Sequence, residues 1–153
     1  MSARAPVPSL EPAFEVTVEL GPLEDHGMTR AGHRRVVPIV GGTVEGAFDG
    51  DILPGGADWQ IARADGGIEI DGRYSARSAD GSLLHLHAVG VRSGPPDVLE
   101  ALLDGEDVDP SRYYFRTVVT VESATHPELE RSLYVASCVR EANRVAYVAY
   151  RVT

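Results

Sequence analysis

The chain has 153 residues, a length that fits one domain able to bury a proper core without disulfides or metals. Its 23 acidic and 14 basic residues leave a formal net charge of −9, which argues against nucleic acid or an anionic membrane as a partner. Cys138 is the single cysteine, so an internal disulfide is excluded and a reducing compartment fits.

The first dozen residues contain three prolines and no apolar run, unlike a signal peptide. No later segment approaches the ~20 apolar residues of a membrane span. We therefore expect a cytoplasmic protein with a disordered tail over residues 1–12 and one folded domain over residues 13–153.

Short strands separated by tight turns dominate the next part of the sequence. Residues 14–20 alternate apolar and polar side chains, as a half-buried strand does. The dipeptides Asp65-Gly66 and Asp80-Gly81 are strong hairpin signals. Further strands are predicted over residues 35–40, 43–48, 59–63, 68–77 and 82–92.

A short helix is predicted after the paired prolines at 95 and 96. Asp97 is the expected N-cap, and Gly105 is expected just past the C-terminus. Strands follow over residues 113–121, 133–139 and 145–152. Seven to nine strands with one short helix indicate an all-β domain, either a sandwich or a closed antiparallel barrel. The hairpin connections favour the barrel, because closure removes exposed strand edges.

The strand over residues 112–121 has two possible orientations. Alternate positions place Tyr113 and Phe115 on an apolar face, and Tyr114 and Arg116 on the opposite face. Either the apolar face is the core and the arginines face water, or the interior is polar near one mouth. In the second case a helix or another subunit covers the apolar outer face.

Tyrosines on neighbouring strands predict a mixed interior. Tyr74 shares a face with isoleucines, whereas Tyr134 and Tyr147 share faces with small residues. Together with Trp59 and Arg116, they would line a mostly apolar pocket that has a few fixed polar groups. Alternatively, the aromatic rings only fill the core, and their hydroxyl groups reach water or backbone.

Acid/base chemistry is the reaction type that the remaining polar residues favour. Asp58 follows a Pro-Gly-Gly turn and precedes the single tryptophan, and burial beside an indole raises the pKa of a carboxyl group. The alternative is a turn residue whose carboxylate accepts from backbone amides. We predict Asp58, Arg116 and Tyr74 as catalytic residues, with the two latter holding developing negative charge. The predicted substrate-binding residues are Trp59, Glu45, Tyr114, Tyr134 and Tyr147.

Several other chemistries lack their motifs. The sequence has no Gly-x-Ser-x-Gly elbow, no Gly-x-Gly-x-x-Gly and no phosphate loop, so no nicotinamide or nucleotide cofactor is expected. His85 and His87 share one face of a strand, a spacing that can hold a metal, but no third ligand lies at a suitable interval. We therefore interpret them as surface histidines and expect no metal.

Five ordered motifs carry a family resemblance that runs from about residue 14 to the C-terminus. They are Gly32–Gly46 with its Pro-Ile-Val-Gly-Gly, Leu53–Gln60 with its Gly-Gly-Ala-Asp-Trp, Arg73-Tyr74, Asp80-Gly81 and Tyr114–Thr117 with its Phe-Arg-Thr. The chain resembles a bacterial and fungal family of unknown function with a calycin-like, or lipocalin-like, β-barrel. The resemblance implies an antiparallel barrel with Asp58, Trp59, Tyr74 and Arg116 in its pocket.

Three functions compete. The first is a cofactor-independent enzyme of the cyclase, isomerase or lyase type, acting by acid/base catalysis on a small, partly apolar metabolite. The second is a barrel that binds a small molecule without chemistry. The third is a structural homo-oligomer whose apolar strand faces form the interface, and a dry, filled barrel would favour it.

Overall fold

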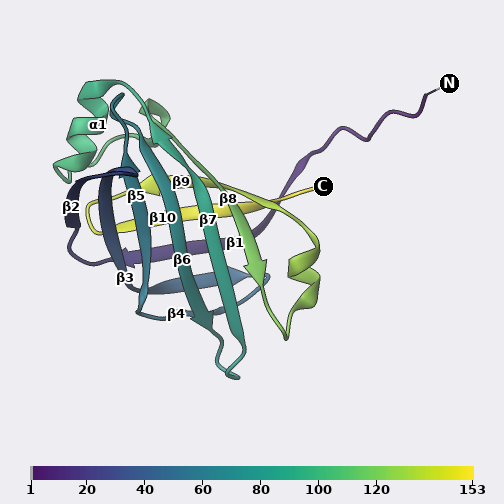
Figure 1. Cartoon of the computed structure of the whole chain (residues 1–153). Helices are drawn as coiled ribbons and strands as arrows, with labels where there is room; N and C mark the ends of the chain where they lie inside the picture. Colours follow the sequence, from purple (N-terminus) through teal and green to yellow (C-terminus); the bar gives the residue numbers. More distant parts are fainter. Residues whose placement is uncertain (1) are drawn as a thin grey trace.

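Antiparallel pairing joins the strands of the computed structural model into one sheet, which curls back on itself (Figure 1). The structure describes residues 2–153. The strands are β1 (Leu10–Leu20), β2 (Glu24–Thr29), β3 (Gly32–Gly46), β4 (Gly50–Ile52), β5 (Gly56–Ala62), β6 (Ile68–Arg77), β7 (Leu83–Ser93), β8 (Tyr114–Glu122), β9 (Tyr134–Arg140) and β10 (Arg144–Val152). The helical elements are α1 (Pro96–Leu103) and the 3₁₀ turns η1 (Pro110–Arg112) and η2 (Pro127–Arg131).

The first strand closes the barrel. β1 pairs with β10 on one side and with β3 on the other, and the strands from β6 to β10 pair with their neighbours in sequence. The short β4 and the longer β5 both lie between β3 and β6. The result is a closed eight-stranded antiparallel barrel with one short α-helix, so the predicted fold class is confirmed.

Alternate residues of each strand face the interior, and β8 shows which set does so. Phe115, Thr117 and Val119 are buried, whereas Tyr114 and Arg116 are exposed on the outer wall. Of the two orientations considered for this strand, the structure therefore has the one with the apolar set inside. The arginine faces water because its neighbours fill the core.

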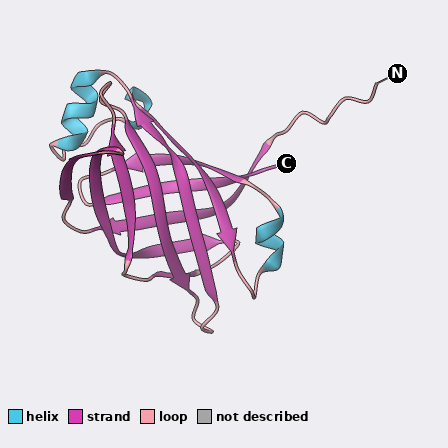
Figure 2. Ribbon diagram, viewed as in Figure 1, coloured by secondary structure: helices cyan, strands magenta, loops and turns pink. Residues whose placement is uncertain are grey.

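The helix covers one end of the barrel (Figure 2). Val98, Leu99 and Leu102 are its buried residues, so its apolar side faces the strands. The predicted N-cap is wrong: Pro95 occupies the N-cap position, and Asp97 lies in the first turn. The expected glycine at the C-terminal end is present, because Gly105 has a positive φ of 77° and donates its N–H to the Leu102 carbonyl.

Two features of the N-terminal region differ from the sequence expectations. β1 begins at Leu10, where the chain already pairs with Val152, so the predicted tail ends too late. The strand β2 was not predicted, since its sequence lacks apolar alternation. Residues 2–9 lead away from the barrel (Figure 1), and Met1 lies outside the described residues. No helix within residues 2–153 has the length and apolarity to cross a membrane.

Gly42 allows the sharp bend of β3 against β1. Its φ is +134°, and a Cβ atom there would lie 1.9 Å from the carbonyl oxygen of Thr17. The bend lets the first part of β3 pair with β5 and the last part pair with β1 and β4. Closure of the barrel therefore depends on a residue without a side chain at this position.

We expect Gly42→Ala to lower the free energy of unfolding by at least about 2 kcal/mol, because backbone strain adds to a steric clash. Gly55→Ala is the matched control, since Gly55 has a φ of +110° but nothing within 4 Å of its would-be Cβ. Only the strain remains there, roughly 1 kcal/mol. Urea denaturation of both variants measures the difference, and equal losses would contradict a special role for the bend.

Candidate functional site

Two adjoining hollows lie inside the barrel. The first, about 240 Å³ in volume, is polar and includes Leu102 and Leu103 of α1 in its wall. The second is apolar, holds about 50 Å³ and extends toward the middle of the barrel. Leu20, Asp58 and Val145 line both hollows, so the two form one cavity with a polar mouth and an apolar floor.

Asp58 lies where the polar and apolar hollows meet. β5 turns Asp58 and Gln60 inward and Trp59 outward, as strand alternation requires. One carboxylate oxygen accepts from the backbone N–H of Asp71 at 2.9 Å, and the other accepts from Nε2 of Gln60 at 2.8 Å. Burial is the largest influence on the carboxyl group and raises its pKa, although these hydrogen bonds and Arg92 act in the opposite direction.

Three arginines surround the polar mouth. Arg35 of β3, Arg92 of β7 and Arg140 of β9 all line it together with Asp58. Burial, together with the positive charges of Arg140 and Arg35, lowers the pKa of Arg92 to about 10. Within residues 2–153, no ion pair joins Asp58 to any of them. The mouth therefore concentrates positive charge in a chain that is acidic overall.

The arginines differ in how the protein holds them. Nη1 of Arg140 donates to the carbonyl groups of the β9–β10 turn, among them that of Ala142 at 3.2 Å. Arg92 is only 4% exposed and lies over the ring of Phe115 at 5.8 Å from its centroid. The Nε atoms of Arg92 and Arg35 and Oε1 of Gln60 are buried without a hydrogen-bond partner. Most buried polar atoms have a partner, so these three mark the mouth as unusual.

The apolar floor ends in two tyrosines from opposite walls. The hydroxyl groups of Tyr74 on β6 and Tyr147 on β10 are 2.5 Å apart, and burial raises the pKa of both. Burial also raises the pKa of the Cys138 thiol to about 12. These groups are therefore neutral near pH 7, so the floor offers hydroxyl groups but no thiolate nucleophile.

The structure separates the predicted site residues into an inner and an outer group. Asp58, Tyr74 and Tyr147 line the cavity. Tyr134 is buried as well, but its hydroxyl donates to the Leu129 carbonyl at 3.0 Å and its ring packs against Phe14. Tyr134 therefore belongs to the core.

The outer group corrects the sequence prediction. Arg116 and Tyr114 lie on the outer wall of β8, where the guanidinium group stacks 5.5 Å from the tyrosine ring. Trp59 is 39% exposed on the outer face of β5, and Glu45 is exposed on β3. The prediction that Asp58 and Arg116 meet is wrong. Alternate residues of β8 point inward, and Arg116 is one of the residues between them, which point outward.

Sequence reasoning missed Arg35, Arg92, Arg140 and Gln60. A signal for the arginines was present, because each lies in phase with an inward series on its strand. Arg92 follows Leu84, Leu86 and Ala88 on β7. Arg140 follows a similar series on β9, and Arg35 precedes Val37 and Ile39 on β3. An arginine in phase with buried apolar residues is a sign of a charged interior.

The two histidines on β7 point outward. Nε2 of His87 lies 2.7 Å from a carboxylate oxygen of Asp71, and Nδ1 of His85 lies 3.3 Å from the Ser75 hydroxyl. The part of the chain that the structure describes contains no group of three or more side chains arranged to hold a metal ion. His87 instead fixes the residue whose backbone amide bonds Asp58.

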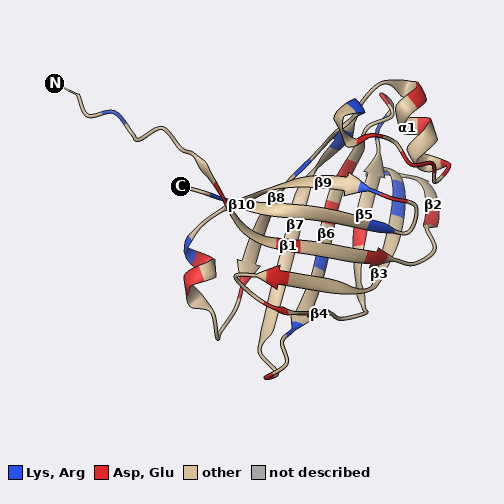
Figure 3. Ribbon diagram, turned by 180° about the vertical axis from the view of Figure 1, so that it is seen from behind, with Lys and Arg blue, Asp and Glu red and all other residues tan. Residues whose placement is uncertain are grey.

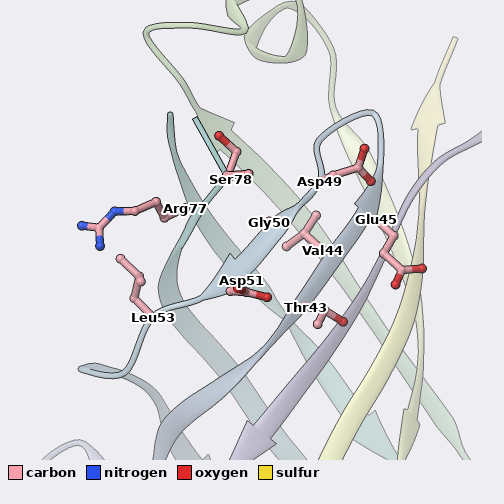
Figure 4. A pocket seen from close by; sticks show the side chains of 10 residues that line it. Thr43, Val44, Glu45, Asp49, Gly50, Asp51, Leu53, Arg77 and Ser78 are labelled. Carbon is pink, nitrogen blue, oxygen red and sulfur yellow. The ribbon is translucent and has the colours of Figure 1, made fainter. Parts of the chain in front are cut away.

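A separate groove of about 680 Å³ lies on the outside of the barrel, over β3 and β4 (Figure 4). Glu45, Asp49 and Asp51 line it together with Arg77. Acidic residues are spread over the strands and loops at both ends of the barrel (Figure 3), so this groove continues the acidic exterior. Glu45 belongs to this groove and not to the interior cavity.

These features define a closed antiparallel β-barrel whose interior cavity has a cationic mouth and an apolar floor. Residues 8–152 match the family described as "Protein of unknown function (DUF3237)", and the chain belongs to this family. A UPF0311 protein of Bradyrhizobium diazoefficiens is 38% identical over 141 residues, which cover 91% of this chain and 93% of the relative.

Solved structures show the same architecture. A conserved protein of unknown function from Rhodopseudomonas palustris is 35% identical, with a TM-score of 0.91, over 98% of this chain and 100% of that one. A β-barrel-like protein from Acinetobacter baumannii is 38% identical, with a TM-score of 0.85, over 99% and 100%. The predicted family and barrel are thus confirmed.

The buried carboxyl group makes stability depend on pH. The folded state holds the Asp58 proton more tightly than the unfolded chain does, since burial raises the pKa above 3.8. Wild-type stability therefore falls as pH rises from about 3.8 to the raised pKa, by about 1.4 kcal/mol for each pH unit between these two values. Asp58→Asn escapes this loss.

We expect the difference in unfolding free energy between Asp58→Asn and wild type to move in favour of the variant over this pH range, and then to level off. Urea denaturation at a series of pH values measures it. A difference that stays constant, or that moves in favour of the variant as pH falls, would refute a raised pKa.

Proposed function

We propose that the barrel cavity is the active site of a cofactor-independent enzyme of the cyclase, isomerase or lyase type, which acts by acid/base catalysis on a small, partly apolar metabolite. The observation that carries the proposal is the place of Asp58, buried where the polar mouth meets the apolar floor. A carboxyl group at such a boundary can reach a reacting atom whose apolar neighbours lie on the floor.

Asp58 moves the proton in this proposal. A pKa raised toward neutrality suits a general acid or base at physiological pH. The hydrogen bonds from Gln60 and from the Asp71 amide hold the carboxylate in one orientation, so little reorganisation is needed when the proton transfers. The apolar lining of the floor offers water few hydrogen-bond partners beside the reacting atoms.

Arg92 takes the part that the sequence assigned to Arg116. Its guanidinium group shares the cavity with Asp58, and it would stabilise negative charge that develops on a substrate oxygen. The neutral hydroxyl pair of Tyr74 and Tyr147 offers a further hydrogen-bond donor at the floor. In this proposal Asp58 transfers the proton, and Arg92 and the tyrosine pair stabilise the negative charge that develops on the substrate.

A barrel that binds a small molecule without chemistry is the second candidate. One observation favours it: both oxygens of Asp58 already accept hydrogen bonds from the protein, as those of a structural carboxylate do. In that case the arginines and tyrosines supply affinity and selectivity only. The two candidates differ in what happens when Asp58 loses its charge.

Native mass spectrometry of protein purified from its host identifies a small molecule that co-purifies. With that compound as the substrate, we expect Asp58→Asn to keep the fold and the affinity, and to lose about 10²–10⁴-fold in kcat. Glu69→Gln is the matched control, because Glu69 is an exposed carboxylate on β6, outside the cavity. We expect its kcat to equal that of wild type.

A pH profile separates the candidates further. The wild-type rate is expected to depend on the titration of Asp58, and the variant should lack that limb. If wild type forms no product and Asp58→Asn changes affinity alone, the binding barrel is the correct function.

A further inference from the structure

Arg92 is a buried cation that the protein leaves without a counter-ion. Its side chain is 4% exposed, its Nε atom has no hydrogen-bond partner, and no carboxylate of residues 2–153 forms an ion pair with it. The guanidinium carbon lies over the Phe115 ring at 5.8 Å from its centroid, a contact that supplies no counter-ion. A buried charge without a partner costs stability, so a role in the core alone does not explain it.

Arg35 and Arg140 increase this cost. Each raises the positive potential at Arg92, and Asp58 is the single acidic residue in the wall of the same hollow. With Asp58 ionised, three positive charges face one negative charge. The hollow therefore attracts a further anion, although the chain as a whole carries a net charge of −9.

The shape of the cavity limits what that anion can be. The polar hollow of about 240 Å³ is below the ~300–1,000 Å³ of pockets for drug-sized ligands, so the ligand is small. The adjoining floor presents Val18, Ile39 and Ile70, which favour an apolar body and exclude a second charge. A free inorganic ion would leave these side chains without a contact.

We propose that the cavity recognises a small organic carboxylate, whose oxygens lie at the guanidinium groups of Arg92 and Arg35 and whose apolar body extends past Asp58 toward Tyr74. This assignment rests on the proposed function, since it names the substrate class of the same site. Planar guanidinium groups match the geometry of a carboxylate, which accepts two parallel hydrogen bonds. Bound there, the carboxylate leaves the α or β carbon of its body next to the Asp58 carboxyl group.

Isothermal titration calorimetry with benzoate and benzamide tests the assignment. The two probes have nearly the same shape and differ in charge. For the wild-type protein we expect benzoate to bind at least about tenfold more tightly than benzamide. Equal affinities would overturn the proposal. Sodium phosphate, which has charge but no apolar body, should fail to displace benzoate at equal concentration, and efficient displacement would overturn the requirement for the floor.

Two arginine variants locate the subsite. Arg92→Gln should lose at least about tenfold in benzoate affinity while its benzamide affinity stays the same. Arg116→Gln removes the same charge from the outer wall of β8, and its benzoate affinity should equal that of wild type. Unchanged binding in Arg92→Gln, or an equal loss in both variants, would overturn the proposal. If Arg92→Gln fails to fold, Arg35→Gln takes its place. The comparison of benzoate with benzamide on the wild-type protein needs neither variant.

The variant Asp58→Asn distinguishes the carboxylate subsite from the acid/base role of Asp58. Removal of the negative charge should leave benzoate affinity equal to or tighter than that of wild type, because one repulsive charge is lost. A tenfold loss would place the carboxylate elsewhere. Failure to detect any turnover leaves these affinities untouched, so the carboxylate subsite and the acid/base role can fail separately.

Discussion

Pairing of β1 with both β10 and β3 creates an interior that water reaches only through the ends of the sheet. In an open sheet both faces would be solvated, and the inward positions of β3, β5, β7 and β9 would carry ordinary surface residues. Closure changes the energy of every charge at those positions, because the dielectric constant falls and hydration is lost. The chemical character of the cavity follows from this constraint.

The consequences are visible in the two charged groups that share the interior. Burial raises the pKa of Asp58 and lowers that of Arg92, so each is pushed toward its neutral form. Two buried groups of opposite charge could stabilise each other as an ion pair, yet each has different partners in the structure. Asp58 is held by an amide and by Gln60, whereas Arg92 is held by an aromatic ring. Both groups line the same polar hollow of about 240 Å³ without forming an ion pair.

Exterior and interior carry opposite charge. The outer groove around Glu45 and Asp51 is acidic, and the mouth beneath α1 is cationic. The acidic exterior has a negative potential, whereas the arginines create a positive potential inside the mouth. Solved structures from Rhodopseudomonas and Acinetobacter have the same barrel fold over nearly the whole chain.

Most of the strands, two hairpins and the short helix could be predicted from the sequence, whereas β2 could not. Alternation and turn residues are local signals, and Asp65-Gly66 and Asp80-Gly81 form turns with positive φ at Gly66 and Gly81. The sequence also pointed to Asp58, through the Pro-Gly-Gly turn before it and the tryptophan after it, and to Tyr74, through its phase with the isoleucines of its strand.

Which other polar residues meet Asp58 depends on how the strands come together in space. On the neighbouring strands β7 and β8, Arg116 lies opposite Val91, and Arg92 lies opposite Phe115. This difference of one position places the Arg116 side chain in water and the Arg92 side chain in the cavity. Register between strands is a long-range property, because it follows from which sheet face the closed barrel buries. Local sequence fixes the alternation along each strand, and closure fixes which half of the alternation becomes the interior.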